Sequence, residues 1–267
     1  MNLQKIERIK GLISGLGSVV VALSGGVDSS VMLRLSIEAL GTAKVLAATY
    51  RSEISPTDEI NLAAQIADYC GVRHEIVPVS DLESAKFAAN PPDRCYFCKF
   101  NSFTKLKKLA EENGFNAVVD GTNKSDTGDH RPGIKALREL GVKSPLMECD
   151  FTKEEIRELA VEFKLPNWNR PSNACLASRF PYGTPISLDN VAKVAGGEAL
   201  LRSMGFTQFR LRHHGSIARI EINTDEFFIL MDQQKRELLV DNLRALGYVF
   251  VTVDLGGYRT GSLNELL

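Results

Sequence analysis

The chain has 267 residues, 44% of them hydrophobic and 24% charged, and its formal net charge is −1. This composition is typical of a globular enzyme with one large or two smaller domains, and it gives no overall electrostatic attraction to nucleic acid, which argues against a dedicated tRNA-binding protein. No apolar run reaches the length of a membrane span, and the first residues lack the apolar core of a signal peptide, so we expect a cytoplasmic protein without membrane contacts.

The spacing of apolar residues predicts alternating helices and strands up to residue 165. Helices are expected over about 3–16, 28–40, 55–70, 98–113 and 152–164, and strands over about 18–23, 44–50, 72–79 and 116–119. Thr152 followed by Glu155 has the pattern of a capping box, which supports the last helix. This alternation favours an α/β fold with a doubly wound parallel sheet.

The rest of the chain has a different pattern. Residues 166–186 are rich in Pro, Asn and Ser, which predicts a linker. After the linker we expect, in order, a helix over 187–204, a hairpin of strands over 207–213 and 217–222, a helix over 233–246 and a strand over 248–255. The expected organisation is therefore an N-terminal domain over 1–165, the linker, and a smaller C-terminal α+β domain over 187–267.

The most specific motif joins the first predicted strand to the second predicted helix and reads Ser24-Gly25-Gly26-Val27-Asp28-Ser29-Ser30. A strand, a glycine turn and a helix start present free backbone N–H groups and the positive end of a helix dipole to an anion. Gly25 and Gly26 let the backbone approach a phosphate closely, and the serine hydroxyls add donors. Two glycines alone would also fit a plain strand-to-helix connection.

The full string SGGVDS resembles the PP-loop of the ATP pyrophosphatases. The resemblance implies a fold like that of the adenine nucleotide alpha hydrolases, and it implies that ATP is cleaved between its α- and β-phosphates. It also implies that the loop binds the pyrophosphate end of ATP through Ser24, Gly25, Gly26, Val27, Asp28, Ser29 and Ser30. Asp28 is expected to act in catalysis by positioning Mg²⁺, although the helix dipole alone also favours an acid at this position.

A second polar turn follows the predicted strand at 116–119. Gly121 and Asn123 are candidates for lining the nucleotide pocket, and Asp126 is a candidate for holding Mg²⁺ through water. A polar loop that caps a helix is the alternative interpretation.

The five cysteines are expected to be thiols or ligands rather than disulfides. Cys95 and Cys98 form a CxxC pair, which alone fits half a zinc site, a redox pair or part of an iron–sulfur cluster. The most plausible third thiol is Cys175 in the linker, where Arg170 and Arg179 could stabilise its thiolate. Cys70 and Cys149 have no such neighbours and are expected in the core.

Several segments together resemble the LarE family, in the family's order: SGGVDSS, RCYFCK, DGTN with DHRPG, RPSNACLASRF, GGEALL and FRLRHHG. LarE proteins take part in synthesis of the nickel-pincer cofactor of lactate racemase. The resemblance implies that ATP adenylates the carboxylates of pyridinium-3,5-biscarboxylic acid mononucleotide, and that sulfur then displaces AMP to give thiocarboxylates. It also implies transient contact with other proteins of the same biosynthesis.

Two LarE subtypes differ in their source of sulfur. In one, a cysteine that matches Cys175 gives up its own sulfur and becomes dehydroalanine. In the other, three cysteines hold a [4Fe–4S] cluster, and Cys95, Cys98 and Cys175 match this second type. A zinc site, a sacrificial Cys175 beside an idle CxxC, a PP-loop tRNA thiolation enzyme and a non-enzymatic nucleotide sensor are the alternatives.

The anionic mononucleotide calls for arginines on the substrate side. Arg179, Arg210 and Arg212 match arginines of the family's substrate site, and Glu198 and Glu221 match its acids. Arg210 and Arg212 alternate along a predicted strand and so share one face. Each could instead be a surface charge or an ordinary ion pair. By resemblance we also expect a homo-oligomer, a hexamer or another trimer-based assembly.

Overall fold

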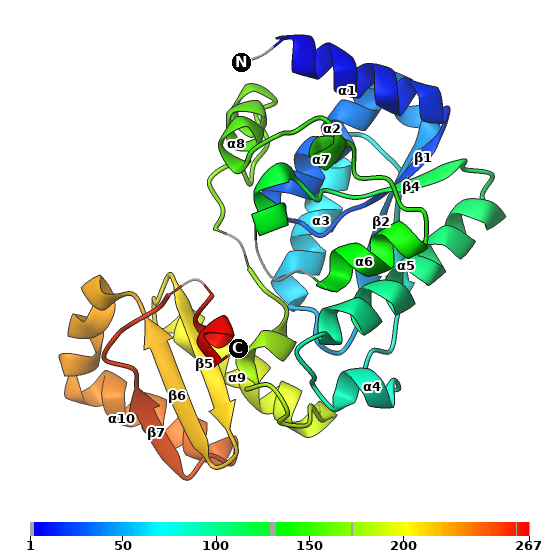
Figure 1. Ribbon diagram of the computed structural model, residues 1–267. Coiled ribbons are helices and arrows are strands. Elements are labelled where there is room, and N and C mark those ends of the chain that lie inside the picture. Colours follow the sequence, from blue (N-terminus) through cyan, green and yellow to red (C-terminus); the bar gives the residue numbers. More distant parts are fainter. Residues whose placement is uncertain (1–2, 129–131, 172, 260, 267) are drawn as a thin grey trace. The chain divides into compact units, whose positions relative to one another are not determined.

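The computed structural model describes residues 3–128, 132–171, 173–259 and 261–266 (Figure 1). Four motif residues, Asp129, His130, Arg131 and Ser172, lie outside these ranges. The chain divides into two compact units. Unit 1 contains the residues up to Asp81 together with Asp93–Asn173, and unit 2 contains Leu82–Pro92 together with the residues from Ala174 onward.

Unit 1 is built around a four-stranded parallel sheet. Its strands are β1 (Val19–Ala22), β2 (Val45–Arg51), β3 (His74–Pro78) and β4 (Ala117–Val119), in the spatial order β3-β2-β1-β4. β1 is entirely buried, as its unbroken Val-Val-Val-Ala sequence predicts for a central strand covered on both faces.

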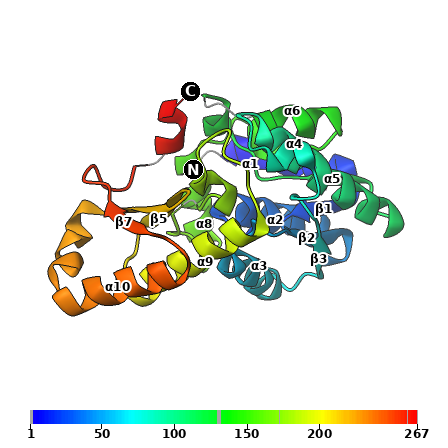
Figure 2. The ribbon, with the colours of Figure 1, turned by 90° about the horizontal axis from the view of Figure 1, so that it is seen from below.

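Helices cover both faces of this sheet. Those of unit 1 are α1 (Leu3–Leu16), α2 (Val27–Leu40), α3 (Thr57–Tyr69), α5 (Arg94–Glu112), α6 (Pro132–Glu139), α7 (Pro145–Glu148) and α8 (Lys153–Glu162). Val19 and Val21 pack in one core with α1, α2, α3 and α8, whereas Val20 packs in a second core with α5 and α6. Alternate residues of one strand therefore serve opposite faces, and Figure 2 shows α3 and α5 on opposite sides of the strands. The predicted doubly wound α/β fold is confirmed.

Unit 2 contains a three-stranded mixed sheet. Strands β5 (Phe209–His214) and β6 (Ile217–Ile222) form the predicted antiparallel hairpin, and β7 (Phe250–Val253) pairs in parallel with β6 after α10 (Gln233–Ala245). Helix α9 (Leu188–Ser203) packs so closely on β5 that a Cβ at Gly197 would lie 2.3 Å from the Leu211 side chain. The predicted smaller α+β region is thus present.

The segment Leu82–Pro92 carries the short helix α4 (Ala85–Ala88) and belongs to unit 2. The buried Asn90 side chain holds it there by donating to the carbonyls of Pro181 and Thr184 at 2.8 and 3.1 Å. The short 3-10 helices of the described chain are η1 (Thr42–Lys44), η2 (Lys124–Gly128), η3 (Leu176–Arg179), η4 (Thr224–Met231) and η5 (Ser262–Leu266).

Helix α5 begins at Arg94, four residues before the predicted start at about 98. The first turn is held by contacts among aromatic side chains that a propensity argument ignores, since Tyr96 stacks on Phe100 and meets Phe97 edge-on. Both cysteines of the CxxC pair therefore lie on a helix. Within the described ranges, no helix is long and apolar enough to cross a membrane.

Candidate active site

The loop between β1 and α2 can only be formed with glycine at its turn. Gly25 has φ +82°, and a Cβ at this position would lie 2.6 Å from the Glu59 carbonyl oxygen in α3. Gly26 is the N-cap of α2 and has no side-chain cap. The first N–H groups of α2 are therefore left for a ligand, as a phosphate-binding helix start requires.

The serines of the loop brace it from within. The hydroxyls of Ser29 and Ser30 donate to the Gly26 carbonyl at 3.0 and 2.9 Å, and both side chains are buried. Ser24 is exposed, and its hydroxyl lies 3.1 Å from the Ser29 hydroxyl. In this conformation Ser29 and Ser30 hold the shape of the loop, whereas Ser24 is the serine open to a ligand.

The second polar turn packs against the first. A Cβ at Gly121 would lie 2.7 Å from the Ser29 nitrogen, so the end of β4 touches the PP-loop backbone. Asn123 is buried and its side-chain oxygen accepts from the Ser125 N–H at 2.9 Å. The Asp126 carboxylate accepts from the Asn123 N–H at 3.1 Å. The sequence therefore brings Gly121, and the turn that follows it, beside the phosphate loop.

A lysine that the sequence analysis did not single out reaches the loop. The Lys153 ammonium, from the first turn of α8, lies 2.5 Å from both carboxylate oxygens of Asp28. Both side chains are about three-tenths exposed. Thr152 and Glu155 form the predicted capping box, which fixes the start of α8 and so the place of Lys153. The loop lacks a lysine of its own, and α8 supplies one.

The CxxC pair lies in the first turn and a half of α5. Cys95 is exposed and Cys98 half-buried, and their spacing of three residues puts them on one helix face. The Cys98 thiol donates to the buried Asp81 carboxylate at 3.7 Å. The half-buried Lys99 ammonium lies over the Phe103 ring at 4.9 Å. Burial opposes its charge, but Tyr50, Asp120 and the two thiols raise the pKa of Lys99, which stays a cation.

Cys175 lies in unit 2, as the N-cap of η3, and is half-buried. The guanidinium of the fully buried Arg179 donates to the Cys175 carbonyl at 3.2 Å. Arg170, the other expected neighbour, instead pairs with Asp58 and Glu59 at 3.0 and 2.8 Å. The remaining cysteines, Cys70 and Cys149, are confirmed in the core, where burial raises the pKa of both thiols.

Two of the three predicted substrate arginines are already paired with the two predicted acids. Arg179 makes a bidentate contact with Glu198 at 2.7 and 3.0 Å, and Arg212 makes one with Glu221 at 3.0 and 2.9 Å. All four side chains are buried. Pairs of this kind hold η3, α9 and the hairpin together as much as they offer charge to a ligand.

Arg210 differs from both. It donates to the Phe209 carbonyl at 2.6 Å and stacks over the Tyr258 ring at 5.0 Å, and within the described chain it makes no ion pair with a carboxylate. Burial and the nearby Arg179 lower the pKa of Arg210 from its usual value. An anion that approached this guanidinium would relieve an uncompensated, partly desolvated charge.

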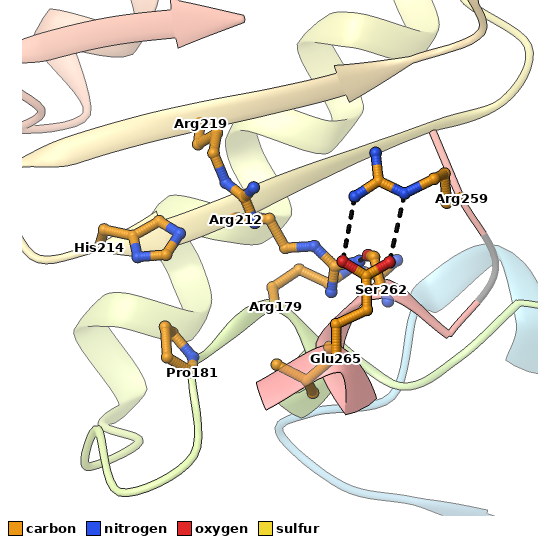
Figure 3. A pocket seen from close by; sticks show the side chains of 9 residues that line it. Arg179, Pro181, Arg212, His214, Arg219, Arg259, Ser262 and Glu265 are labelled. Atoms are coloured by element: carbon orange, nitrogen blue, oxygen red, sulfur yellow. Dashed lines mark hydrogen bonds and ion pairs between the residues drawn. The ribbon is translucent and has the colours of Figure 1, made fainter. Parts of the chain in front are cut away.

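A cavity of about 310 Å³ opens beside the paired arginines in unit 2. Figure 3 shows Arg179, Arg212, Arg219 and Arg259 around it, with Glu265 bridged to Arg259. Other lining residues are Pro181, His214, Ser262 and Leu263. Four arginines around one cavity favour an anion. The edges of Arg179 and Arg212 that face away from the glutamates already donate to the carbonyls of Ala174 and Ser178, at 2.9 and 2.6 Å.

A thiolate-bound cluster needs cysteines whose sulfur a metal can reach. Cys95 is exposed, and Cys98 and Cys175 are half-buried. These are suitable donors. Among the described side chains no group of three His, Cys, Asp or Glu is arranged as a metal site; the first two cysteines belong to unit 1 and the third to unit 2.

Comparisons with known proteins agree with this geometry. The NAD synthase family model matches residues 8–126. The chain is 38% identical over 258 residues, 96% of this chain and 92% of the relative, to pyridinium-3,5-bisthiocarboxylic acid mononucleotide synthase of Lactiplantibacillus plantarum. It is 35% identical over 98% of both chains to an uncharacterized protein of Synechocystis sp.. A segment of 77 residues, 29% of this chain and 28% of the relative, is 42% identical to an NH₃-dependent NAD⁺ synthetase of Chlorobaculum tepidum.

The parallel sheet, the loop after β1 and the family match define an ATP-dependent enzyme of the PP-loop class. Similarity to the NAD⁺ synthetase covers only part of the chain, whereas similarity to the L. plantarum synthase extends along nearly all of it. Within the PP-loop class the chain belongs to the LarE family.

Sequence reasoning missed three residues that contact the PP-loop or the CxxC helix. Lys153 lies within a capping-box motif that predicts only a helix start, and its contact with Asp28 joins positions far apart in the sequence. Lys99 follows Cys98 directly on α5, and only the fold brings its ammonium over the ring of Tyr50 in β2, at 5.7 Å. Asn167, in the predicted linker, donates to the PP-loop itself. A loop composition rich in Asn and Pro carries no signal for such a contact.

Proposed function

We propose that this chain converts the two carboxylates of pyridinium-3,5-biscarboxylic acid mononucleotide into thiocarboxylates, one after the other, at the expense of ATP. The observation that carries the proposal is the 38% identity, over 96% of this chain, to an enzyme named for that bisthiocarboxylic product. The geometry of the PP-loop and the arginine-lined cavity of unit 2 support it.

In the first step a substrate carboxylate oxygen attacks the α-phosphorus of ATP. The P–O bond to the β-phosphate breaks, and pyrophosphate leaves with the electron pair, giving an acyl adenylate. The uncapped start of α2 and the Gly25-Gly26 turn stabilise the leaving pyrophosphate through backbone N–H groups. Bound Mg²⁺, held by Asp28 and by Asp126 through water, would neutralise phosphate charge.

Lys153 has a place in the same step. In the structure its ammonium neutralises Asp28. Once a divalent cation takes over the Asp28 carboxylate, the lysine becomes available to the phosphates as a flexible point charge. It would thus supply the cation that the loop itself lacks.

In the second step hydrosulfide attacks the acyl carbon of the adenylate. The C–O bond to AMP breaks, AMP leaves with the electron pair, and the thioacid loses its proton to give the thiocarboxylate. Cys95, Cys98 and Cys175 would be the thiolate ligands of a [4Fe–4S] cluster. When bound through three cysteines, such a cluster supplies one iron with an open position for hydrosulfide.

On the substrate side, the phosphate and carboxylates of the mononucleotide would be bound in unit 2. Arg210 is the strongest candidate because it has no carboxylate partner in the described chain. Arg179 and Arg212 would contribute mainly positive charge, because Glu198, Glu221 and nearby backbone carbonyls already accept from most of their N–H groups. We expect the two glutamates to set the positions of the arginines rather than to contact the anion directly.

The source of sulfur is tested by anaerobic reconstitution with iron and sulfide. We expect about four irons per chain, lost in a Cys95→Ala/Cys98→Ala double variant. Cys70→Ala, in the core, is the matched control and should bind iron as the wild type does. Full iron binding by the double variant would contradict the cluster hypothesis. Loss of one sulfur from Cys175 during turnover would favour sacrificial transfer of the cysteine sulfur instead.

A PP-loop tRNA thiolation enzyme is the second candidate, because a segment of 163 residues is 33% identical to a probable tRNA sulfurtransferase of Methanothermobacter thermautotrophicus. That match covers only 41% of the relative, and the net charge of −1 offers no general attraction to tRNA. A salt-dependent tRNA complex in a gel-shift assay would favour it. Cytoplasmic location, a trimer-based homo-oligomer and contacts with other proteins of the biosynthesis remain predictions.

A further inference from the structure

Asn167 makes contacts that no motif of the sequence explains. Its side chain is 3% exposed, and its Nδ2 donates to the Gly25 carbonyl at 2.8 Å and to the Ser30 hydroxyl at 3.0 Å. A carbonyl oxygen can only accept, so the orientation of the Asn167 amide is fixed by this contact. Both of its N–H bonds therefore serve the PP-loop.

These two contacts determine which way the peptide groups of the loop point. Asn167 holds the Gly25 carbonyl directly. Through the Ser30 hydroxyl it also supports the Gly26 carbonyl, which accepts from that hydroxyl at 2.9 Å and from the Ser30 N–H at 3.1 Å. In a trans peptide the N–H points opposite to the preceding C=O. Holding the Gly25 carbonyl toward buried Asn167 turns the Gly26 N–H to the opposite side of the peptide, where it donates to the exposed Ser24 hydroxyl at 3.3 Å.

Packing alone does not account for an amide at this position. The Asn167 Oδ1 atom is buried without a hydrogen-bond partner among the described residues, and burying an unpaired acceptor is destabilising. An apolar side chain would avoid that cost, and an aspartate of the same shape could not donate. The Asn167 NH₂ group is the part of the side chain that makes hydrogen bonds, and both of its acceptors lie in the loop.

The segment that contains Asn167 also supports the loop from a second side. Arg170 and Asn173 donate to the Glu59 carboxylate at 2.8 and 3.1 Å. The backbone carbonyl of Glu59 is the atom that faces Gly25. All of these residues belong to unit 1.

We propose that Asn167 is a positioning residue for pyrophosphate: it holds the glycine peptides of the PP-loop in the orientation that binds the pyrophosphate end of ATP. The inference rests on the proposed function in so far as the loop binds ATP. It adds a residue of the predicted linker to the ATP site, one that acts through Gly25 and Ser30 and does not touch the ligand.

The test measures binding of inorganic pyrophosphate, with Mg²⁺, by calorimetry on the full chain. Asn167→Ala should weaken binding about tenfold, as loss of two hydrogen bonds to the loop implies, and Asn167→Asp should weaken it further because a carboxylate cannot donate and repels the ligand. The KM for ATP should rise in parallel. The matched control is Asn116→Ala, which removes a 2.9 Å donation to the Leu16 carbonyl at the opposite end of the sheet. It should leave pyrophosphate affinity unchanged.

The outcomes separate the two hypotheses. A wild-type chain that binds neither pyrophosphate nor ATP would refute the proposed function. A wild-type chain that binds pyrophosphate, with an Asn167→Asp variant that binds it equally well, would overturn the role of Asn167. If Asn167→Ala does not fold, Asn167→Leu carries the test, because its side chain is of similar size and leaves no polar atom unpaired. Combining it with Ser30→Ala should weaken binding less than the product of the two separate effects, and full additivity would also contradict the inference.

Discussion

Replacing Gly25 by alanine tests whether the PP-loop is held in one conformation by contact with α3. At φ +82° an alanine is strained by about 1–3 kcal/mol. Its Cβ would also lie 2.6 Å from the Glu59 carbonyl oxygen, a backbone atom that can move only with the helix. Overpacking of this kind adds about 1–3 kcal/mol. We therefore expect a loss of about 2–6 kcal/mol in the free energy of unfolding, together with loss of pyrophosphate binding.

Gly114→Ala is the matched control for this variant. Gly114 has a similar φ of +73°, but a Cβ there would meet no atom within 4 Å. Urea unfolding of both variants separates backbone strain, which they share, from the contact with Glu59, which only Gly25→Ala makes. Pyrophosphate calorimetry on the same samples reports the effect on the loop. Equal losses of stability in the two variants, or retained pyrophosphate affinity in Gly25→Ala, would refute the close contact as the reason for glycine.

Three further predictions concern buried and paired charges. Glu198→Gln should lower the free energy of unfolding in urea by about 3–5 kcal/mol, because it leaves the fully buried Arg179 guanidinium unpaired; a loss below 1 kcal/mol would contradict this. Burial lowers the pKa of His213, so the unfolded chain binds more protons than the folded chain below about pH 6.5, and the free energy of unfolding falls as the pH drops. In unfolding curves from pH 7 to 5 this fall should be shallower for His213→Gln. An equal slope in the two proteins would contradict the role of His213. Lys153→Met should weaken ATP binding about tenfold or more. Lys5→Met, which breaks the ion pair between Lys5 of α1 and Glu155 of α8, should leave ATP binding unchanged. Equal effects of the two variants in calorimetry would contradict a special role of Lys153.

Periodicity was a reliable guide where it acts over a whole element. The four strands of the parallel sheet, the hairpin and the longer helices follow from the pattern of apolar residues, which alternates or recurs along elements with one buried face and is unbroken in the central strand β1. It failed for short elements. Helix α6 has only eight residues, with Gly133, Ala136 and Leu137 buried, and α7 spans a single turn after Ser144. Stretches this short are difficult to recognise from periodicity.

The chemistry of the site was partly readable from sequence for a different reason. Gly25 and Gly26 are local features, because the turn that presents backbone N–H groups is made by adjacent residues. The contacts of Lys153 with Asp28 and of Asn167 with Gly25 join residues more than a hundred positions apart. A single sequence contains nothing that pairs them. The carboxylate partners of the arginines could likewise not be predicted, because the bidentate contacts of Arg179 and Arg212 depend on which faces of α9 and β6 pack against them.

The most direct measurement follows one anaerobic turnover with ATP, pyridinium-3,5-biscarboxylic acid mononucleotide and isotopically labelled sulfide. Pyrophosphate and AMP should be released together, and mass spectrometry should find labelled sulfur in place of carboxylate oxygen in the product. The intact chain should keep the mass of an unmodified Cys175. Unlabelled product together with a chain that has lost one sulfur, or product formed without release of pyrophosphate, would contradict ATP-driven sulfur transfer from a source outside the polypeptide.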